Sequence, residues 1–549
     1  MKKSKNPKTP AAARWLPWAL AAAAALAALA AYEPALGGDF VFDDRYLPFL
    51  NPGLVNAPLS AWLSHTRPIL TASFWLHLRA LGSEPFTCHL VNLLLHLLNS
   101  YLVFRILRRF VLRAELAAFG AAVFLLHPLQ TESVSYVASR SEALSAAFLL
   151  GSLAVFVWRR AEAVTWRRSG AVLALFGGAV LTKEHTAVLP ALFLLIDYYW
   201  GAIRGNWRFY VPLAAACAAG LAFVASVLRA SNTAGFAVKN LAWHEYFFTQ
   251  CRVIWTYLRL YVLPSGQNLD PDVPISRGPL DHGAIAGLAG LAALAAAAWW
   301  WRKREPMFFL GILVFLVLLA PTSSFVPIRD PLAERRMYLP MLGLILATVA
   351  LLRRWSASGA ARNGALGLVL VVLSALTYQR NLVWAGSIPL WEDTAAKSPA
   401  KARPRFQLAF AYYEAGRCAD AVREFEATAR LQPPDYELLV DWALALDCNN
   451  QSGEALDRLQ RAAQLEPSAH AYALLGMIHG KRGEREAALA ALERAESIRP
   501  DFDMLYAYRG NLFLMSQEYE RAAGEFRRAL ALNPSNPAAL QGLRMAGRR

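Results

Sequence analysis

The sequence predicts an all-α protein in two parts: a polytopic helical membrane domain of about eleven spans, then an α-solenoid built from short helical repeats. Two observations carry this prediction. The chain of 549 residues is 56% hydrophobic and only 17% charged, which is too apolar for an ordinary soluble enzyme. After residue 380 the long Leu, Val and Ala runs give way to mixed polar segments with a regular repeat. We therefore divide the chain into a membrane domain (1–380), a connecting half-repeat (381–401) and a repeat domain (402–549).

Eleven apolar runs are candidate membrane spans, several of them short for a bilayer about 30 Å thick. Lys and Arg outnumber Asp and Glu by 56 to 40, and the excess gathers in alternate short loops between the runs. The positive-inside rule assigns such loops to the cytoplasm, so the charge reports topology rather than a nucleic-acid partner. The runs are 14–32, 87–107, 114–129, 141–158, 169–182, 186–200, 209–228, 283–301, 307–321, 337–352 and 364–379.

An odd number of spans after a cytoplasmic N-terminus places the C-terminus outside. The outer segments are then 33–86, 130–140, 229–282 and 322–336. The apolar stretch 251–263 is interpreted as interfacial or re-entrant, because Arg252 and Arg259 lie within it; counting it as a span would reverse everything that follows. The first run also fits a cleaved signal peptide, and either interpretation leaves Asp43 outside.

The repeat after residue 380 is marked by prolines. Pro399, Pro433, Pro467, Pro500 and Pro534 are spaced 34, 34, 33 and 34 residues apart. Twelve residues before each of the last four lies an alanine, and four residues after the alanine lies a large apolar residue. These pairs are Ala421 with Phe425, Ala455 with Leu459, Ala488 with Leu492, and Ala522 with Phe526. The pattern is that of tetratricopeptide repeats, about four of them over 402–535, which bind extended peptides or proteins in a groove.

The five cysteines have no spacing typical of metal ligands. Cys88, Cys217 and Cys251 lie in or near apolar runs, where we expect them to pack. Cys418 and Cys448 lie near the inter-helix turns of neighbouring repeats, where a disulfide is chemically allowed. For these two we favour free thiols.

Ionisable residues recur at the predicted outer ends of the spans. They occur in "GDFVFDD" (38–44), "RPILTASFWLH" (67–77), "HPLQTESVSYVASRSEAL" (127–144), "TKEHT" (182–186) and "RDPLAERRMYLP" (329–340). Each one alone is more simply an interfacial anchor, and this applies to His77, His89 and His96 as well. Because ionisable groups at membrane depth are costly, their recurrence at several spans indicates a functional site. The residues concerned are Asp43, Asp44, His127, Glu132, Arg140, Glu142, Lys183, Glu184, Glu334, Arg335 and Arg336.

The order of these motifs resembles a known family. GDFVFDD, RP-x-x-T, HP-x-x-TE-x-V-x-x-x-x-x-R, KE, ER-x-x-YLP and a final RN-x-x-W before the repeats look like the transmembrane and tetratricopeptide repeat (TMTC) proteins, which are O-mannosyltransferase-like enzymes of the GT-C membrane fold. The resemblance covers nearly the whole chain. This chain departs from the family in having few repeats and in reading "RNLVWAG" (380–386), where the family usually carries an acidic residue after the Trp.

The resemblance implies transfer of a mannose-like hexose from a polyprenyl-phosphate sugar to a hydroxyl, usually of Ser or Thr. Asp43 is the predicted base, and Asp44 would raise the proton affinity of the pair or orient the acceptor. The leaving phosphate gains negative charge that fixed cations must stabilise. The predicted contacts to the phosphate or substrate are Arg140, ranked first, and Lys183, Arg335, Arg336, Arg67 and His127, with Glu132 and Glu334 holding the cations in position.

Three classes of function stay open: a protein O-glycosyltransferase, a GT-C transferase acting on a glycolipid or envelope glycan, and a non-enzymatic membrane scaffold. A scaffold has no use for Asp43 beside Asp44 at a water–lipid boundary. We expect no metal and no cofactor besides the polyprenyl-phosphate sugar, which is the donor substrate. The expected partners are this donor, an acceptor protein or peptide docked by the repeats, and the bilayer. The Ala-, Arg- and Leu-rich composition suits a GC-rich bacterium, so the expected location is an inner membrane with the repeats in the periplasm and an undecaprenyl-type carrier.

Overall fold

The computed structural model describes residues 12–158, 163–230, 233–356 and 358–547. They form two compact units, Met1–Lys397 and Ser398–Arg549, and the segment that connects the last span to the repeats groups with the first unit. Every named element among the described residues is a helix. The predicted fold class, a helical membrane part followed by a repeat solenoid, is confirmed.

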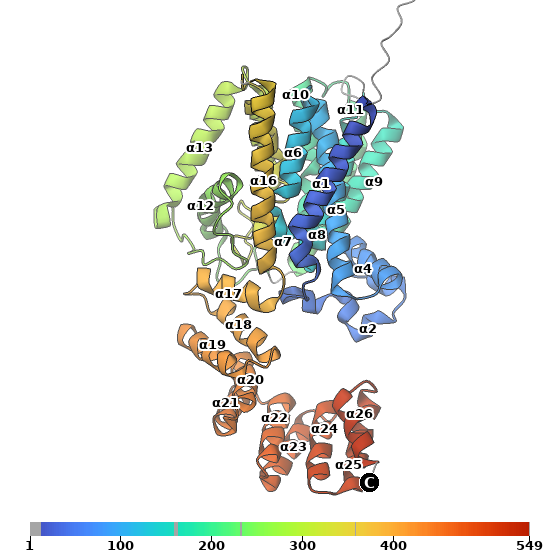
Figure 1. Ribbon diagram of the computed structural model, residues 1–549, viewed down its shortest axis with the longest axis vertical. Helices are drawn as coiled ribbons and strands as arrows, with labels where there is room; N and C mark the ends of the chain where they lie inside the picture. The colour runs from blue at the N-terminus through green and yellow to red at the C-terminus, as the bar shows by residue number, and fades with distance from the viewer. Residues whose placement is uncertain (1–11, 159–162, 231–232, 357, 548–549) are drawn as a thin grey trace, which may run out of the picture. The chain divides into compact units, whose positions relative to one another are not determined.

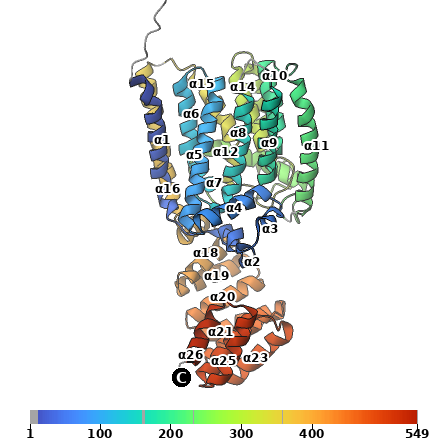
Figure 2. The ribbon, with the colours of Figure 1, turned by 90° about the vertical axis from the view of Figure 1, so that its right-hand side faces the viewer.

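In the described part of the first unit, each predicted span falls on a helix (Figures 1 and 2). These helices are α1 (Ala12–Leu36), α5 (Pro85–Phe110), α6 (Ala114–Leu126), α8 (Arg140–Phe156), α9 (Trp166–Thr182), α10 (Leu189–Trp200), α11 (Trp207–Ala230), α13 (Ala284–Trp301), α14 (Pro306–Leu319), α15 (Met341–Leu352) and α16 (Gly359–Val383). By length and composition, α1, α5, α11, α13 and α16 can cross a membrane, and α6, α14 and α15 are shorter apolar helices. The number of crossings stays a prediction.

Helix α12 (Trp243–Val262) contains the ambiguous stretch 251–263. Near its start, the Tyr246 hydroxyl donates a hydrogen bond of 2.6 Å to the Thr322 carbonyl, just after α14 ends. Near its other end, the Tyr261 carbonyl lies 2.9 Å from His127, just after α6 ends. Both contacts join α12 to the segments that follow α14 and α6, and the interfacial interpretation of 251–263 stays a prediction.

One end of the bundle carries the polar segments, and we call it the polar end. It holds the 3₁₀ turns η1 (Phe42–Tyr46), η3 (Pro128–Gln130), η4 (Val137–Ser139), η5 (Glu184–Val188) and η7 (Glu334–Met337), with η2 (Pro48–Leu50), α2 (Pro52–Val55), α3 (Leu59–Leu63), α4 (Pro68–Leu81), α7 (Thr131–Val134) and α17 (Ser387–Lys397). A small core of apolar side chains, including Phe49, Trp62, Phe74 and Val137, ties the first of these segments to α5 and η4.

Helices α14 and α15 cross with their main chains in contact. A Cβ atom at Gly311 would lie 2.6 Å from the Ala347 nitrogen, and one at Gly343 would lie closer still to the Phe315 nitrogen. Only glycine fits such an approach. Because η7 lies in the connection between these two helices, their crossing fixes where η7 sits.

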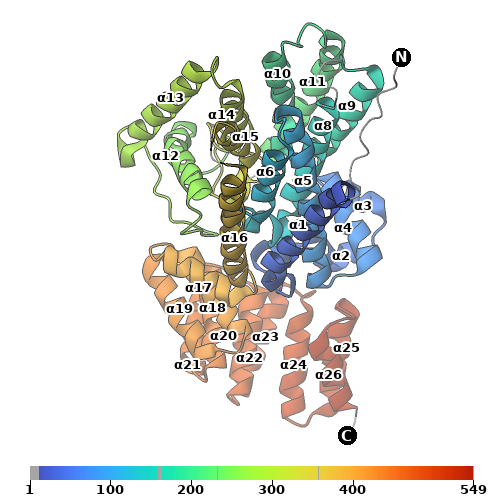
Figure 3. The same ribbon diagram turned by 45° about the horizontal axis from the view of Figure 1, so that its top comes forward.

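The second unit consists of helix pairs in succession (Figure 3). They are α18 (Ala402–Glu414) with α19 (Cys418–Leu431), α20 (Tyr436–Cys448) with α21 (Ser452–Leu465), α22 (Ala469–Lys481) with α23 (Arg485–Ile498), and α24 (Asp503–Met515) with α25 (Tyr519–Leu532), followed by α26 (Pro537–Ala546). All four alanines of the sequence pattern, and the large apolar residue that follows each, are completely buried. The predicted repeat helices are therefore confirmed.

Cys418 and Cys448 form a disulfide, so the expectation of free thiols is wrong. Cys418 begins α19 and Cys448 ends α20, and the packing of these neighbouring helices brings their Cα atoms to 5.7 Å. That separation lies within the usual range for a disulfide. The sequence places both cysteines near turns but cannot give this distance.

Replacing both cysteines with serine should lower the free energy of unfolding of the repeats by about 3.6 kcal/mol, because the bond closes a loop of 30 residues. The measurement is thermal melting of the whole protein with and without reductant. The double variant should match the reduced wild type, and reductant should not shift it further. Equal melting of wild type and variant without reductant would contradict a bonded pair.

Candidate functional site

The two adjacent aspartates of the opening motif have opposite environments. Asp44 is completely buried, and its carboxylate accepts hydrogen bonds from the main-chain N–H groups of Ala138 (2.6 Å), Val41 (3.3 Å) and Val137 (3.4 Å). The bonds from Val137 and Ala138 therefore hold η1 against η4. Burial raises the pKa of Asp44 to about 7, although these hydrogen bonds favour its ionised form.

Asp43, by contrast, is exposed and forms no ion pair among the described residues. Its N–H donates to the Tyr136 hydroxyl at 3.1 Å. The preceding Phe42 has a φ of 51°, a left-handed conformation that a bulky side chain rarely adopts. Such strain persists only where the surroundings enforce it, which points to a functional loop. The arrangement leaves one carboxylate buried among main-chain donors and the other exposed beside the Tyr136 hydroxyl.

Tyr136 belongs to an aromatic and amide framework to which the sequence analysis gave no role. Its ring stacks on Trp384 at 5.8 Å between centroids. The next-door Ser135 hydroxyl donates to the Asn381 carbonyl oxygen at 2.5 Å, and the Asn381 amide donates to the Ala31 carbonyl at 2.8 Å. Asn381 and Trp384 are two of the three specified residues of the pattern RN-x-x-W, so the sequence shows the motif but does not show which residues it contacts.

Three ion pairs join residues from different charged motifs at the polar end. Arg67 donates to both oxygens of Glu184, at 3.1 and 2.7 Å. Lys183 Nζ lies 2.6 Å from Glu142 Oε1 and 3.1 Å from the Ser141 hydroxyl. Arg335 pairs with Glu132, whose second oxygen accepts the Arg335 main-chain N–H at 3.0 Å. We call Arg67, Glu184, Lys183, Glu142, Arg335 and Glu132 the ion-pair cluster.

The members of this cluster also act on one another electrostatically. Burial would raise the pKa of Glu184, but the Arg67 guanidinium outweighs it and lowers that pKa to about 2. Burial would lower the pKa of Arg335, but the charges of Glu132, Tyr136 and Glu142 together raise it. Burial raises the pKa of Tyr136, the charge of Asp43 raises it further, and the charge of Arg335 lowers it. Tyr136 is therefore a common neighbour of the exposed aspartate and of Arg335 in the cluster.

Arg140, ranked first for contact with the donor phosphate, is only 1% exposed. It donates from Nε to the Asn92 side-chain oxygen at 3.1 Å and from Nη2 to the Cys88 carbonyl at 3.3 Å, and its guanidinium lies 4.4 Å from the centre of the Phe74 ring. Nη1 has no partner among the described residues. In this position Arg140 holds α8 against α5 and the adjacent η4 turn.

Two other predicted site residues have their polar atoms occupied by the main chain. Both ring nitrogens of His127 are used: Nδ1 accepts from the Leu129 N–H at 3.2 Å, and Nε2 lies 2.9 Å from the Tyr261 carbonyl. Arg336 donates to the carbonyls of Pro331 (2.8 Å) and Asp330 (2.5 Å). These bonds shape the loops around the cluster.

Glu334 was expected to hold a cation in position, and its hydrogen bonds differ from that expectation. Its oxygens accept from the Gln267 side-chain amide and from the Asn268 N–H, both at 2.6 Å. The segment that follows α12 is thus fixed to η7, and Lys397 donates to the Gln267 carbonyl at 2.8 Å. Burial raises the pKa of Glu334 to about 7.

The two buried carboxyls, Asp44 and Glu334, predict a pH-dependent stability. Their unfolded pKa values lie near 4, and their folded values are about 7. Raised pKa values contribute stability at low pH that is lost as the pH rises from 4 to 7, by about 1.4 kcal/mol per pH unit for each group. Buried histidines such as His77, whose pKa burial lowers to about 4, contribute in the opposite direction over part of this range, so the prediction concerns the difference between wild type and a variant that lacks one carboxyl.

Asp44→Asn should flatten this pH dependence, whereas Glu84→Gln, at an exposed carboxyl, should leave it unchanged. An unchanged pH dependence in Asp44→Asn would contradict a raised pKa of Asp44. The difference between the two variants is thus the decisive observation.

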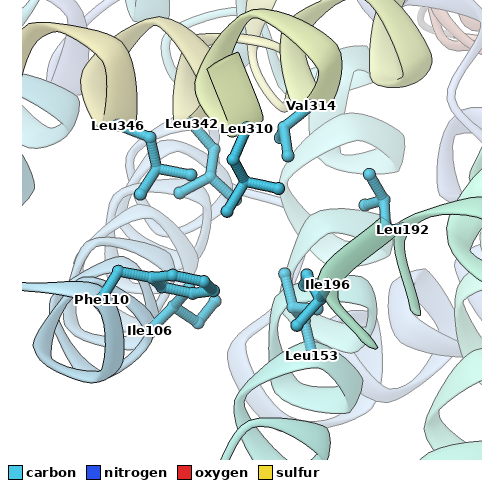
Figure 4. A pocket seen from close by; sticks show the side chains of 9 residues that line it. All are labelled: Ile106, Phe110, Leu153, Leu192, Ile196, Leu310, Val314, Leu342 and Leu346. Carbon is cyan, nitrogen blue, oxygen red and sulfur yellow. The ribbon is translucent and has the colours of Figure 1, made fainter. Parts of the chain in front are cut away.

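In the part of the chain that the structure describes, no three His, Cys, Asp or Glu side chains are grouped so that they could hold a metal ion. An apolar pocket lies elsewhere in the bundle, among α5, α8, α10, α14 and α15, and Figure 4 shows the side chains around it. All of its lining residues are apolar, from Ile106 and Phe110 on α5 to Leu342 and Leu346 on α15. It is separate from the ion-pair cluster and offers a phosphate no partner.

No protein-family model matches the chain. Curated relatives are nevertheless found. A protein O-mannosyl-transferase of Caenorhabditis elegans is 24% identical over 441 residues, which span 74% of this chain and 61% of the relative. The mouse protein O-mannosyl-transferase TMTC3 is 22% identical over 542 residues, 87% of this chain and 58% of the relative. The fruit fly protein Tmtc1 is 33% identical over 146 residues, 24% of this chain and 17% of the relative.

The chain thus spans about three fifths of the length of the first two relatives. The resemblance to the TMTC proteins is confirmed. Among solved structures, the chain is similar to a TPR protein of Thermus thermophilus (19% identity, 34% of this chain and 97% of that one, TM-score 0.27) and to the TPR protein YrrB (19% identity, 33% and 89%, TM-score 0.25).

Proposed function

We propose that this chain, whose curated relatives are named protein O-mannosyl-transferases, is a membrane glycosyltransferase. It moves a mannose-like hexose from a polyprenyl-phosphate donor to Ser or Thr hydroxyls of proteins. The observation that carries the proposal is Asp43, an exposed carboxylate without an ion pair among the described residues, on a strained loop whose main chain contacts Tyr136. A scaffold protein needs neither this strained loop nor the cations beside it.

In the proposed reaction the acceptor hydroxyl oxygen attacks the anomeric carbon of the sugar. The bond from that carbon to the phosphate oxygen breaks, and its electron pair stays with the polyprenyl phosphate. The hydroxyl proton passes to Asp43, which is the general base. The departing phosphate monoester carries one more negative charge than the donor did, so cations at the site lower the barrier.

Arg335 and Lys183 are best placed to supply that charge. Their side chains are 28% and 15% exposed, and both lie in the ion-pair cluster. Arg140 is too deeply buried to meet the phosphate in this arrangement, so we propose that it positions η4 and the aspartate loop instead. This reverses the ranking drawn from the sequence. Arg67, which bonds both oxygens of Glu184, is proposed to shape the rim of the site.

The repeats are proposed to hold the acceptor protein, because stacked helix pairs present an extended concave surface. The polar end and the repeats are proposed to face outside the cytoplasm, in a bacterium the periplasm. The Cys418–Cys448 disulfide supports this side, since such bonds persist in oxidising compartments and are rare in the cytosol.

The side of the membrane can be tested directly. A reporter that fluoresces only in the cytoplasm, fused after Arg549, should stay dark, because the span count and the disulfide both favour an external C-terminus. The same reporter inserted after Gly201, between α10 and α11, should be bright. Bright cells with the C-terminal fusion would place the repeats in the cytoplasm and exclude the proposed acceptor role.

The activity itself can be tested with purified protein in nanodiscs. Polyprenyl-phosphate mannose and a Ser/Thr-rich acceptor protein should give a mass increase of one hexose, and Asp43→Asn should make this transfer much slower. If hexose appears only on an added glycolipid, the enzyme belongs to the second class of function. Absence of transfer to either acceptor from mannose and glucose donors would contradict the proposal.

A further inference from the structure

Each part-exposed cation of the ion-pair cluster already has a carboxylate partner. Arg67, Lys183 and Arg335 carry three positive charges, and their glutamates carry three negative ones. An anionic phosphate that enters the cluster must therefore share a cation with a carboxylate or bring additional positive charge with it. The three pairs differ in how readily the cation can leave its carboxylate and contact a phosphate.

Two of the pairs are held at two points. Arg67 bonds both oxygens of Glu184, which is the bidentate geometry that fixes a guanidinium firmly. Glu132 binds Arg335 through the side chain with one oxygen and through the main-chain N–H with the other. Neither glutamate has a free oxygen with which to change partner.

The third pair is held at one point. Glu142 Oε1 lies 2.6 Å from Lys183 Nζ, whereas Oε2 faces Nε2 of His185 at 3.6 Å. This distance is too long for a hydrogen bond but suits an ion pair when the imidazole is protonated. Nδ1 of His185 is buried and has no partner among the described residues. Glu142 therefore lies between Lys183, which is a cation, and His185, which becomes a cation when it is protonated.

The groups around His185 favour its neutral form. Burial lowers its pKa most, and Lys183 and Arg67 lower it further, while Glu142 and Glu184 oppose them. These four charged groups come from η5 itself, from α8, from the end of α9 and from the segment before α4. An arriving phosphate adds negative charge to the same surroundings, which shifts the balance towards the imidazolium.

We infer that His185 takes up a proton when a phosphate binds, pairs with Glu142, and so releases the Lys183 ammonium to the phosphate. This inference rests on the proposed function, which brings a polyprenyl-linked phosphate to the cluster. The proton comes from the solvent and returns to it when the phosphate leaves, and no other covalent bond changes. His185 is thus a positioning residue that acts on the phosphate through Glu142 and Lys183.

The test is calorimetric binding of farnesyl phosphate, a short isoprenyl phosphate monoester, to the whole protein in nanodiscs at pH 8. At this pH the probe is already a dianion, because the second pKa of a phosphate monoester is about 6. Titrations in two buffers with different ionisation enthalpies give the number of protons taken up. The wild type should take up a substantial fraction of a proton, approaching one, and its affinity should fall by up to about tenfold per pH unit above pH 8.

His185→Gln should bind more weakly at pH 8, without this proton uptake and with little dependence on pH. His185→Lys supplies a fixed charge and should bind with near wild-type affinity, also without uptake. His65→Gln changes an exposed histidine two residues from Arg67 and should behave as the wild type does. Melting temperatures establish that each variant is folded.

Two results separate this inference from the function on which it rests. Farnesyl phosphate binding without proton uptake by the wild type, or uptake that persists in His185→Gln, overturns the inference and leaves the proposed function standing. No binding of farnesyl phosphate by the folded wild type at any pH from 6 to 9 overturns both.

Discussion

Asp43→Asn should lower the rate of hexose transfer by roughly 10²–10⁴-fold, the usual effect of losing a general base. Asparagine keeps the size and polarity of the side chain but cannot accept the proton of the acceptor hydroxyl. Asp43 is exposed, so its replacement should change the free energy of unfolding by less than about 0.5 kcal/mol. The measurements are transfer in nanodiscs and binding of the polyprenyl-phosphate donor, which should stay unchanged.

Asp44→Asn is the matched comparison, because it replaces one carboxyl oxygen of the neighbouring residue with an amide nitrogen, as Asp43→Asn does. All three partners of Asp44 are N–H donors, and an amide offers them one oxygen in place of two. The variant should lose about 1–3 kcal/mol of stability, the cost of leaving a buried donor unpaired, with a smaller loss of transfer. Full activity in both variants would remove the aspartate loop from the mechanism.

Arg335→Met should lower transfer by about 10²–10³-fold, as expected when one group that stabilises developing charge is lost. It should also destabilise the protein by about 3 kcal/mol, because the Glu132 side chain, 1% exposed, would keep its charge without a partner. The readouts are the rate of transfer and the melting temperature.

A double variant separates these two effects. Glu132→Gln with Arg335→Met removes both charges of the pair, so the melting temperature should recover while transfer stays low. Recovery of transfer together with stability would show that Arg335 serves the fold alone. Arg336→Lys offers a further contrast, since Arg336 bonds main-chain carbonyls and should affect stability more than transfer.

The repeat helices could be predicted from the sequence because they repeat a local rule. A small residue and a large apolar one recur at a fixed period, and each helix pair packs mainly on its neighbours. The disulfide could not be predicted in the same way. It depends on the 5.7 Å approach of Cys418 and Cys448, which follows from how two helices cross.

The candidate site was only half predictable for a related reason. The sequence shows which residues are ionisable at the ends of apolar runs, and it did indicate Asp43, Lys183 and Arg335. It does not show their partners, because Lys183 and Glu142 are 41 residues apart and Arg335 and Glu132 are 203 apart. The sequence also does not show burial. Asp43 and Asp44 are adjacent and identical in type, yet Asp43 is exposed and Asp44 is completely buried.

The crossing of α14 and α15 at Gly311 and Gly343 determines how freely this protein can be re-engineered. Side-chain contacts can be repacked by compensating changes, but two main chains in contact leave no room for compensation. Because η7 lies in the connection between these helices, even an alanine at either glycine would push them apart and displace Arg335. A library of variants of this protein should therefore hold both glycines constant.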